Sequence, residues 1–351
     1  MQPKKKYLSI IITVLLLTVV GIGIEFLTSG RPPILSGFYK LNLILLCINI
    51  ILAVSLNLIN GFTGQFSIGH AGFMAVGAYV SAVFTQKLML IDKLATILSL
   101  DPSGDVAKTL GLLIAAIIGA LAAALVGLII GLPTLRLNGD YLAIATLGMG
   151  EIIKGTVLNI EYVGGAAGMS GISQLSSWTT VFVVMCVSVL IIRNFINSTH
   201  GRACISIREN EIASEVMGIN VTKYKVLAFA IGAFFAGLAG ALHAHFFYTI
   251  QPGTYNFLQS FNILVMVVLG GLGSITGSIL GATVMTFLYA ALQDLAALRM
   301  VIVALLLVVM MLFRPQGLLG NKEFSLAMFN GLFGKKSPVS GGDQSERTIS
   351  K

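Results

Sequence analysis

Charged residues are scarce in this chain, and their scarcity limits what the protein can be. Only 10% of the 351 residues are Asp, Glu, Lys or Arg, whereas 56% are apolar. A soluble protein needs about a quarter charged residues to cover its surface. No basic run is interleaved with the aromatic residues that base stacking needs, so no nucleic-acid partner is expected. The composition excludes a cytosolic enzyme and predicts an all-α protein that crosses the lipid bilayer several times.

Cysteines and catalytic motifs are also few. Cys47 and Cys186 lie within apolar runs and Cys204 lies in a basic loop, so neither a disulfide framework nor a cysteine metal site is indicated. His243 and His245 are two residues apart, so on a helix they point away from each other and cannot share a metal. No phosphate-binding loop and no grouping of serine, histidine and acid is found. We expect no catalytic site, no ATPase site and no cofactor in this chain.

Ten apolar segments are candidate membrane spans, because about 20 apolar residues are needed to cross the hydrocarbon core. They are residues 7–28, 41–59, 66–85, 109–131, 141–158, 179–192, 226–250, 257–270, 275–292 and 300–313. An even number of spans puts both termini on one side, and the lysines at both ends predict that this side is the cytoplasm. We expect a transmembrane domain over residues 1–320 and a cytoplasmic tail over 321–351, disordered from about residue 335.

Two segments stand out by their charge. Residues 226–293 contain no formally charged residue, so we expect the functional core of the membrane domain there. Residues 87–108 hold three lysines although the predicted topology places them outside, which conflicts with the preference of lysine for cytoplasmic loops.

Small residues recur at four-residue spacing in three of the expected spans. The three series are Ala115, Gly119, Ala123, Gly127 and Gly131; Ala228, Gly232, Ala236, Gly240 and Ala244; and Gly273, Gly277 and Gly281. Each series forms a groove along one helix face, which allows a neighbouring backbone to approach closely. The pattern predicts tight helix packing, either within the chain or between two chains.

Polar side chains interrupt the Gly- and Ala-rich segment 61–79. Gln65, Ser67, His70 and Tyr79 are costly at membrane depth unless they face protein or water. One interpretation is the wall of a translocation path, in which Gln65 and His70 exchange hydrogen bonds with a polar solute. The other is a helix entry, in which Ser67 caps the helix and His70 bonds to a carbonyl. The sequence leaves both open.

Two carboxylates occur in the segment 137–154. Asp140 at the start of a helix complements the helix dipole, which is a structural role. Glu151 lies about three turns further on, and Lys154 is placed to form an ion pair with it. A proton-coupled carboxylate in a translocation path is the alternative interpretation of Glu151.

The basic loop 198–225 predicts a short amphipathic helix. Ile205, Ile212 and Val216, with Ala213 and Met217, would form one apolar stripe opposite the charged residues, and Gly218 would end the helix as a left-handed cap. The acidic residues of the polar face disfavour docking on an anionic lipid surface. We therefore expect the apolar stripe to bind a protein partner in the cytoplasm.

Taken together, these segments resemble the membrane-spanning subunits of ABC importers for branched-chain amino acids, of the longer LivM type. The resemblance covers roughly residues 40–320. It rests on residues 64–79, 139–148 and 269–282, and on the closing motif FRPQGLLG at 313–320. Four separated matches in order are more specific than any one of them.

The resemblance implies an all-α permease fold of the branched-chain amino-acid and ribose type, in a bacterial cytoplasmic membrane. In such importers a loop with a Glu-Ala-Ala signature docks as a coupling helix on the ATPase. Counting back from Gly218 places Ile212, Ala213 and Ser214 at the signature positions, with Glu211 one residue early. The implied partners are a second, LivH-like permease subunit, two cytoplasmic ATPase subunits that bind ATP, and an extracytoplasmic solute-binding protein.

Rival functions remain at this stage. A proton-coupled amino-acid transporter would use Asp140, Glu151 and His70 as proton carriers and would need no ATPase. A solute channel would need no cytoplasmic partner helix, and an intramembrane enzyme lacks a candidate site. Related permeases for urea or short amides also fit, so the exact substrate stays open.

Overall fold

The structure is a computed structural model. It describes residues 37–89 and 104–320, except positions 136, 138, 315 and 319. The expected first span 7–28, most of the 87–108 segment and the tail 321–351 lie outside the described residues.

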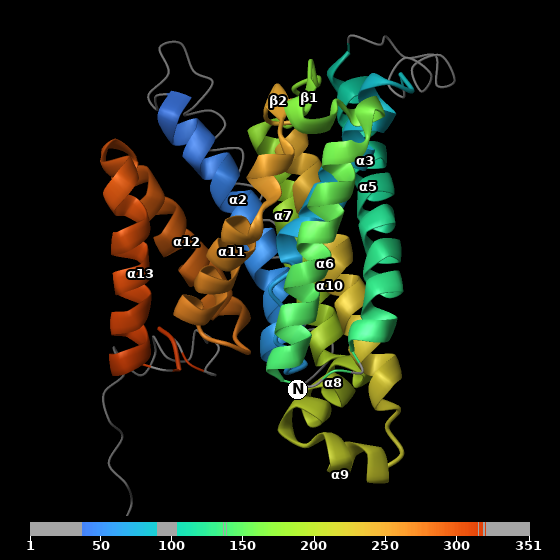
Figure 1. The fold of residues 1–351 in the computed structure, drawn as a ribbon, viewed down its shortest axis with the longest axis vertical. Helices are drawn as coiled ribbons and strands as arrows, with labels where there is room; N and C mark the ends of the chain where they lie inside the picture. Colours follow the sequence, from blue (N-terminus) through green and yellow to red (C-terminus); the bar gives the residue numbers. More distant parts are fainter. Residues whose placement is uncertain are drawn as a thin grey trace, which may run out of the picture.

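The described chain is a bundle of helices with one minimal strand pair (Figure 1). The helices are α2 (Gly37–Asn57), α3 (His70–Gln86), α5 (Asp105–Thr134), α6 (Asp140–Asn159), α7 (Trp178–Asn197), α8 (Thr199–Glu209), α9 (Glu211–Val216), α10 (Val221–Ala244), α11 (Phe257–Gly270), α12 (Ile275–Ala291) and α13 (Ala296–Phe313). Strand β1 (Met169–Ser170) pairs antiparallel with β2 (Thr249–Ile250), so that Met169 lies opposite Ile250. Nine of the ten expected spans coincide with helices; the tenth, 7–28, is not described.

Five of these helices are long and apolar enough to cross a membrane. They are Gly37–Phe62, Val106–Thr134, Asp140–Asn159, Trp178–Asn197 and Val221–Ala244. Phe257–Gly270, Ile275–Ala291 and Leu298–Met310 are apolar but shorter. Helix α2 passes directly into a π-helical turn, Leu58–Phe62, so the two form one continuous helical segment.

One expected span starts later than the hydropathy indicates. The sequence predicts a span over 66–85, which would include Ser67, but the helix begins at His70. Gly64 adopts a φ of +73°, which ends the preceding turn, and the chain up to Gly69 has no regular structure. Gln65 and Ser67 are nevertheless buried, because this segment runs through the protein and not through lipid.

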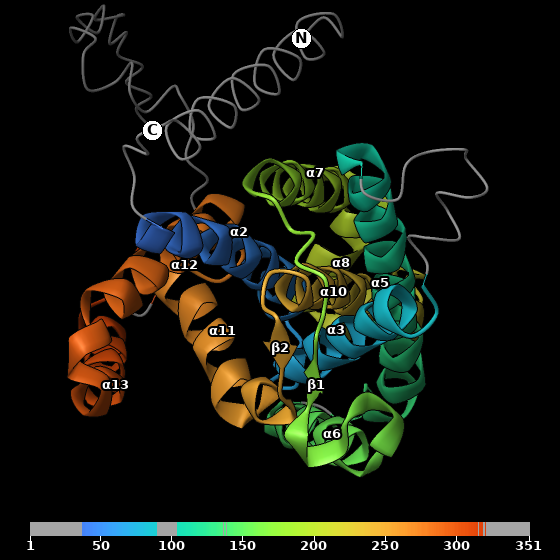
Figure 2. The same cartoon turned by 90° about the horizontal axis from the view of Figure 1, so that it is seen from above.

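Helix α10 lies at the centre of the bundle, in contact with α2, α3 and α5 (Figure 2). Helices α11 and α12 pack on α2, and α13 lies outermost (Figure 1). The charge-free segment 226–293 thus forms most of α10 together with α11 and α12, which pack on one another and on α2. This packing explains why the segment contains no charged residue.

The small-residue series pack within the chain. A side chain added at Gly77 of α3 would overlap the backbone of Gly237 in α10, and one at Gly119 of α5 would lie 2.6 Å from the Gly77 carbonyl oxygen. Gly240 similarly meets the Met74 backbone. These contacts bring the backbones of α3, α5 and α10 close together. The small residues of these helices therefore serve helix packing within the chain.

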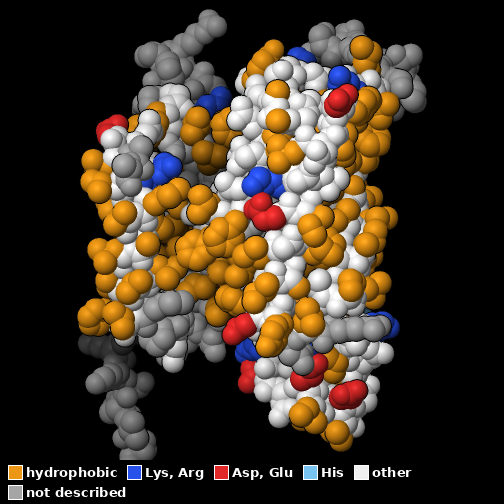
Figure 3. Space-filling view, in the orientation of Figure 1, with side chains coloured by type: hydrophobic (Ala, Val, Ile, Leu, Met, Phe, Trp, Pro, Cys, Tyr) orange, Lys and Arg blue, Asp and Glu red, His pale blue; other side chains and the backbone are white. Residues whose placement is uncertain are grey.

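Charged and apolar side chains are distributed differently along the bundle. In Figure 3 apolar side chains cover much of its height, whereas the lower tip around α8 and α9 carries several charged groups. The β1–β2 pair lies at the opposite end (Figure 1). The distribution fits a bilayer around the bundle, with the α8–α9 end on one side and the strand pair on the other.

The close contact of α3 with α10 predicts a strong effect of Gly77→Val. The added side chain has no space beside the Gly237 backbone, and we expect the free energy of unfolding to fall by at least about 3 kcal/mol. Gly148→Val is the matched control, because nothing lies within 4 Å of a side chain added there. The measurement is the unfolding temperature of the purified protein in detergent; equal temperatures for both variants would contradict the packing.

The orientation of the bundle can be tested with introduced cysteines. Native Cys204 is a poor reporter, because its side chain is only 1% exposed and burial raises the pKa of its thiol to about 11, so that it stays protonated near neutral pH. In a cysteine-free chain, we expect Tyr248→Cys beside β2 to react with a membrane-impermeant thiol reagent in intact cells. Ile212→Cys in α9 should react only after the cells are opened. The reverse pattern would invert the topology.

Candidate functional site

The predicted amphipathic helix is in fact two helices. Asn210 adopts an extended backbone, with φ −160° and ψ 109°, and separates α8 from α9. Its side-chain oxygen accepts a hydrogen bond from the Ala213 amide at 3.0 Å and so caps α9. The single stripe predicted from Ile205 to Val216 is therefore wrong. Ile205 belongs to α8 and packs partly buried against the core.

Helix α9 leaves its apolar side chains in the open. Ile212 is 76% exposed, and Val216 and Met217 are each 81% exposed. Ala213 is exposed beside them, whereas Ser214 is buried and bonds to the Asn210 carbonyl oxygen. We call Ile212, Ala213, Val216 and Met217 the α9 patch.

The end of α9 is built as predicted. Gly218 has a φ of +84°, its amide donates to the Glu215 carbonyl, and the Ile219 amide donates to the Ser214 carbonyl. These two bonds form the usual left-handed helix ending, which only glycine adopts without strain. The cap fixes the direction in which the chain leaves α9 toward α10.

Two side-chain contacts fasten the α8–α9 pair to the bundle, and a third joins the segment before α3 to α10 beside them. Lys225 of α10 is buried and forms an ion pair with Glu211 of α9 at 2.7 Å. The Arg208 guanidinium of α8 donates to the Gly61 carbonyl oxygen in the π-helical turn at 2.8 Å. Gln65 adds a bond from its side-chain nitrogen to the Lys225 carbonyl oxygen at 3.1 Å. Glu211, whose role the sequence left open, thus anchors the pair.

The π-helical turn that Arg208 contacts continues α2, and α2 is joined to α12. Asn57, fully buried just before the π-helical turn, donates to the Ser274 carbonyl at 2.9 Å and to the Ser278 hydroxyl at 2.7 Å. Its side-chain oxygen accepts from the Gly273 amide at 2.9 Å. One side chain therefore ties α2 to the start of α12. Asn57 was missed in the sequence, because a lone asparagine in an apolar run does not reveal its partner.

The residues predicted for a translocation path have separate environments. The His70 ring Nε2 lies 2.8 Å from the Ser55 hydroxyl, so it bonds to a side chain and not to a carbonyl. Ser67 does not cap α3, whose cap position is Gly69; the Ser67 backbone pairs with the side chain of Asn60. Within the described residues, the Ser67 hydroxyl and the Gln65 side-chain oxygen have no hydrogen-bond partner.

Tyr79 and Glu151 lie elsewhere. The Tyr79 hydroxyl donates to the Ile250 carbonyl at 3.4 Å, near the strand pair. Glu151 forms the expected ion pair with Lys154 at 2.9 Å and accepts a hydrogen bond from the Phe257 amide at 3.0 Å, at the start of α11. Asp140 begins α6 as expected. These contacts give Glu151 a structural role in joining α6 to α11.

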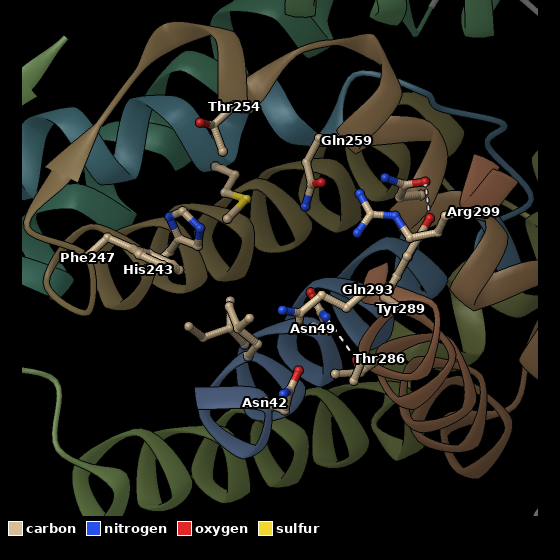
Figure 4. A pocket seen from close by; sticks show the side chains of 15 residues that line it. Asn42, Asn49, His243, Phe247, Thr254, Gln259, Thr286, Tyr289, Gln293 and Arg299 are labelled. Atoms are coloured by element: carbon tan, nitrogen blue, oxygen red, sulfur yellow. Dashed lines mark hydrogen bonds between the residues drawn. The ribbon is translucent and has the colours of Figure 1, made fainter. Parts of the chain in front are cut away.

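A cavity of about 400 Å³ lies between α2, α3, α10, α11, α12 and α13 (Figure 4). His243, in the last turn of α10 before β2, lines it, so the cavity lies toward the strand-pair end of the bundle and away from α9. Its polar lining is Asn42, Asn49, His243, Thr254, Gln259, Asn262, Thr286, Tyr289, Gln293 and Arg299. None of the five residues predicted for the path from sequence lines it. The cavity was not predicted from the sequence, because its side chains come from helices far apart in the chain.

Known proteins with similar sequences identify the family of this chain. Residues 40–313 match the family described as branched-chain amino acid transport system / permease component. This chain belongs to that family. The transport system permease LivM of Salmonella typhimurium is 32% identical over 81% of this chain and 70% of its own length. LivM of Escherichia coli shows the same identity and coverage.

Other family members are more distant. LivH of Escherichia coli, also named a permease of a high-affinity branched-chain amino acid transport system, is 25% identical over 78% of this chain and 91% of its own length. No solved structure was found to match the chain significantly. As a member of this family with several apolar helices, the chain is a multi-pass membrane protein.

Asn57 provides a test of the link between α2 and α12. We expect Asn57→Ala to lower the free energy of unfolding by about 3 kcal/mol, because it removes three hydrogen bonds and leaves the partly buried Gly273 amide unpaired. Asn159→Ala is the matched control, since that side chain makes one exposed bond within its own helix. Thermal unfolding in detergent is the measurement. A variant as stable as the control would show that the link contributes little.

Proposed function

We propose that this chain is the permease subunit of an ATP-binding cassette importer and forms half of the translocation path for branched-chain or related amino acids. The family and the names of its relatives support the transport role. The observation that carries the ATP-driven mechanism is the exposed α9 patch, held out beyond the bundle by a rigid attachment. The proposed location of the protein is the cytoplasmic membrane of a bacterium.

The α9 patch is proposed as the surface that docks on the ATPase. Large apolar side chains on a short helix outside the lipid gain stability when a partner covers them. Ile212, Ala213 and Val216 supply the contact, Ser214 holds the helix from within, and Gly218 sets its direction. Ile205 has a supporting role only, because it packs α8 against the core.

The proposed partners follow from this assignment. Relatives of two permease types, LivM and LivH, support a pair of related permease subunits. Two cytoplasmic ATPase subunits would bind ATP, and an extracytoplasmic solute-binding protein would deliver the amino acid. This chain has a transport role and no ATPase site of its own in the proposal, so energy must arrive through α9.

The fastening of α9 suggests how that energy reaches the path. ATPase closure would move α9, the Lys225 and Arg208 contacts would carry the movement to α10 and α2, and Asn57 would pass it to α12. Two arrangements of these packed helices would open the path to one side or the other. A proton-coupled mechanism has less support, because Glu151 is already paired with Lys154 and with the α11 amide.

Docking of α9 predicts the result of Ile212→Asp. A charge placed in an apolar contact without a partner costs several kcal/mol, and each 1.4 kcal/mol is about tenfold in affinity. We expect the ATPase to be lost on purification and ATP-driven leucine uptake by the complete transporter to fall at least about tenfold. Folding should be unchanged, because the native Ile212 side chain is already 76% exposed.

Ile160→Asp is the matched control, since Ile160 is exposed in the loop after α6, at the end opposite α9. It should retain both the ATPase and uptake. Full retention of the ATPase with normal uptake in Ile212→Asp would remove the coupling role of α9. Leucine uptake by the chain alone, driven by a pH gradient, would instead support a secondary transporter.

A further inference from the structure

The cavity between α2 and α13 combines apolar and polar lining residues, as small-molecule sites do. Its size of about 400 Å³ falls within the range of ligand pockets, and polar side chains from five helices and from the short turns at Thr254 and Gln293 line it. In Figure 4 the side chains of His243, Gln259, Asn49 and Arg299 point toward a common space. It lies toward the end of the bundle opposite α9, which the proposed function places outside the cell.

Arg299 is the only charged residue among the described residues that line the cavity. Its guanidinium carbon lies over the Tyr289 ring, 5.1 Å from the ring centroid, and its Nε is buried without a hydrogen-bond partner in the described part of the chain. Asp294, in the preceding turn, is exposed and forms no ion pair with it. A partly buried cation with an unused donor is costly unless an anion pairs with it.

Tyr289 helps to place the guanidinium. Its hydroxyl donates to the Asn262 side-chain oxygen at 2.6 Å, which fixes the ring under Arg299. A guanidinium held over a ring can still donate from its terminal N–H groups, and their planar arrangement matches the two oxygens of a carboxylate. Arg299 therefore has the chemistry to bind a carboxylate.

The remaining lining suits the other parts of an amino acid. Leu45, Ile48 and Met74 supply an apolar wall for a branched side chain. Gln259 and Asn49 offer side-chain oxygens that accept from an ammonium group. No acidic residue lines the cavity within the described chain, so a ligand with a net positive charge is disfavoured.

We propose that this cavity is a binding site for the transported solute and that Arg299 binds the carboxylate of that solute. The inference rests on the proposed function and adds to it a binding residue for the solute. Urea and short amides carry no anion to pair with Arg299, whereas leucine and its relatives carry one. Anionic lipid headgroups share this chemistry, so the test includes them.

Direct binding to the full chain tests the proposal. The chain is placed in phosphatidylcholine nanodiscs, and binding of leucine, 4-methylpentanoate and 4-methylpentanamide is measured by saturation-transfer NMR. The acid and the amide differ only at the group that would meet Arg299. We expect the acid to bind at least about tenfold more tightly than the amide, the range of a charge-assisted hydrogen bond.

Variants assign the preference to one side chain. Arg299→Met should abolish the difference between acid and amide, and Arg299→Lys should retain part of it, because lysine keeps the charge but not the planar edge. Arg193→Met is the matched control at an exposed arginine of α7 and should bind like the wild type. An unchanged preference in Arg299→Met would overturn the assignment.

The outcomes separate this inference from the proposed function. Equal binding of acid and amide by the wild-type chain, with leucine uptake by the complete transporter intact, would overturn the carboxylate site alone and needs no variant. Uptake of urea in place of leucine would overturn the proposed function. Acid binding that disappears when phosphatidylglycerol is added to the nanodiscs would assign Arg299 to a lipid headgroup and overturn the solute site.

Discussion

The close approach of three helix backbones is the constraint on which the rest of the structure depends. Gly77 of α3, Gly119 of α5 and Gly237 of α10 lie where no larger residue fits, so these helices meet without side chains between them. Between helices in lipid there is little hydrophobic gain, and van der Waals contact over such faces supplies much of the association. This close approach places α10 at the centre of the bundle. It thereby also places α9, which precedes α10, and β2, which follows it.

Several polar contacts inside the bundle join segments that are distant in the sequence. Asn57 reaches Gly273 and Ser278, and Ser55 reaches His70. In a low-dielectric interior an unpaired polar group is expensive, so each such pair specifies one arrangement of its helices. The buried asparagine just before the π-helical turn therefore fixes the position of α2 relative to the start of α12.

The two ends of the molecule are suited to different tasks. At one end α9 presents exposed apolar side chains on a helix fastened by Lys225 and Arg208, and this is the surface proposed to dock on the ATPase. At the other, Arg299 and its neighbours line the cavity proposed to bind the solute. The chain between them contains no charged residue from 226 to 293, so the connection is made by packing and by neutral hydrogen bonds. Rigid helices joined in this way transmit a shift as a whole.

The sequence alone determined the membrane class, the approximate positions of nine of the described helices, the Glu151–Lys154 pair and the Gly218 cap. These features depend on local properties, namely the transfer free energy of consecutive residues and contacts within one or two helical turns. The tertiary structure decided what local properties cannot. It divided the predicted amphipathic helix at Asn210, moved the start of α3 to His70, and brought Asn57 to Gly273 and Arg299 to the cavity. Each depends on which helices pack together, and that is set by the fit of entire faces.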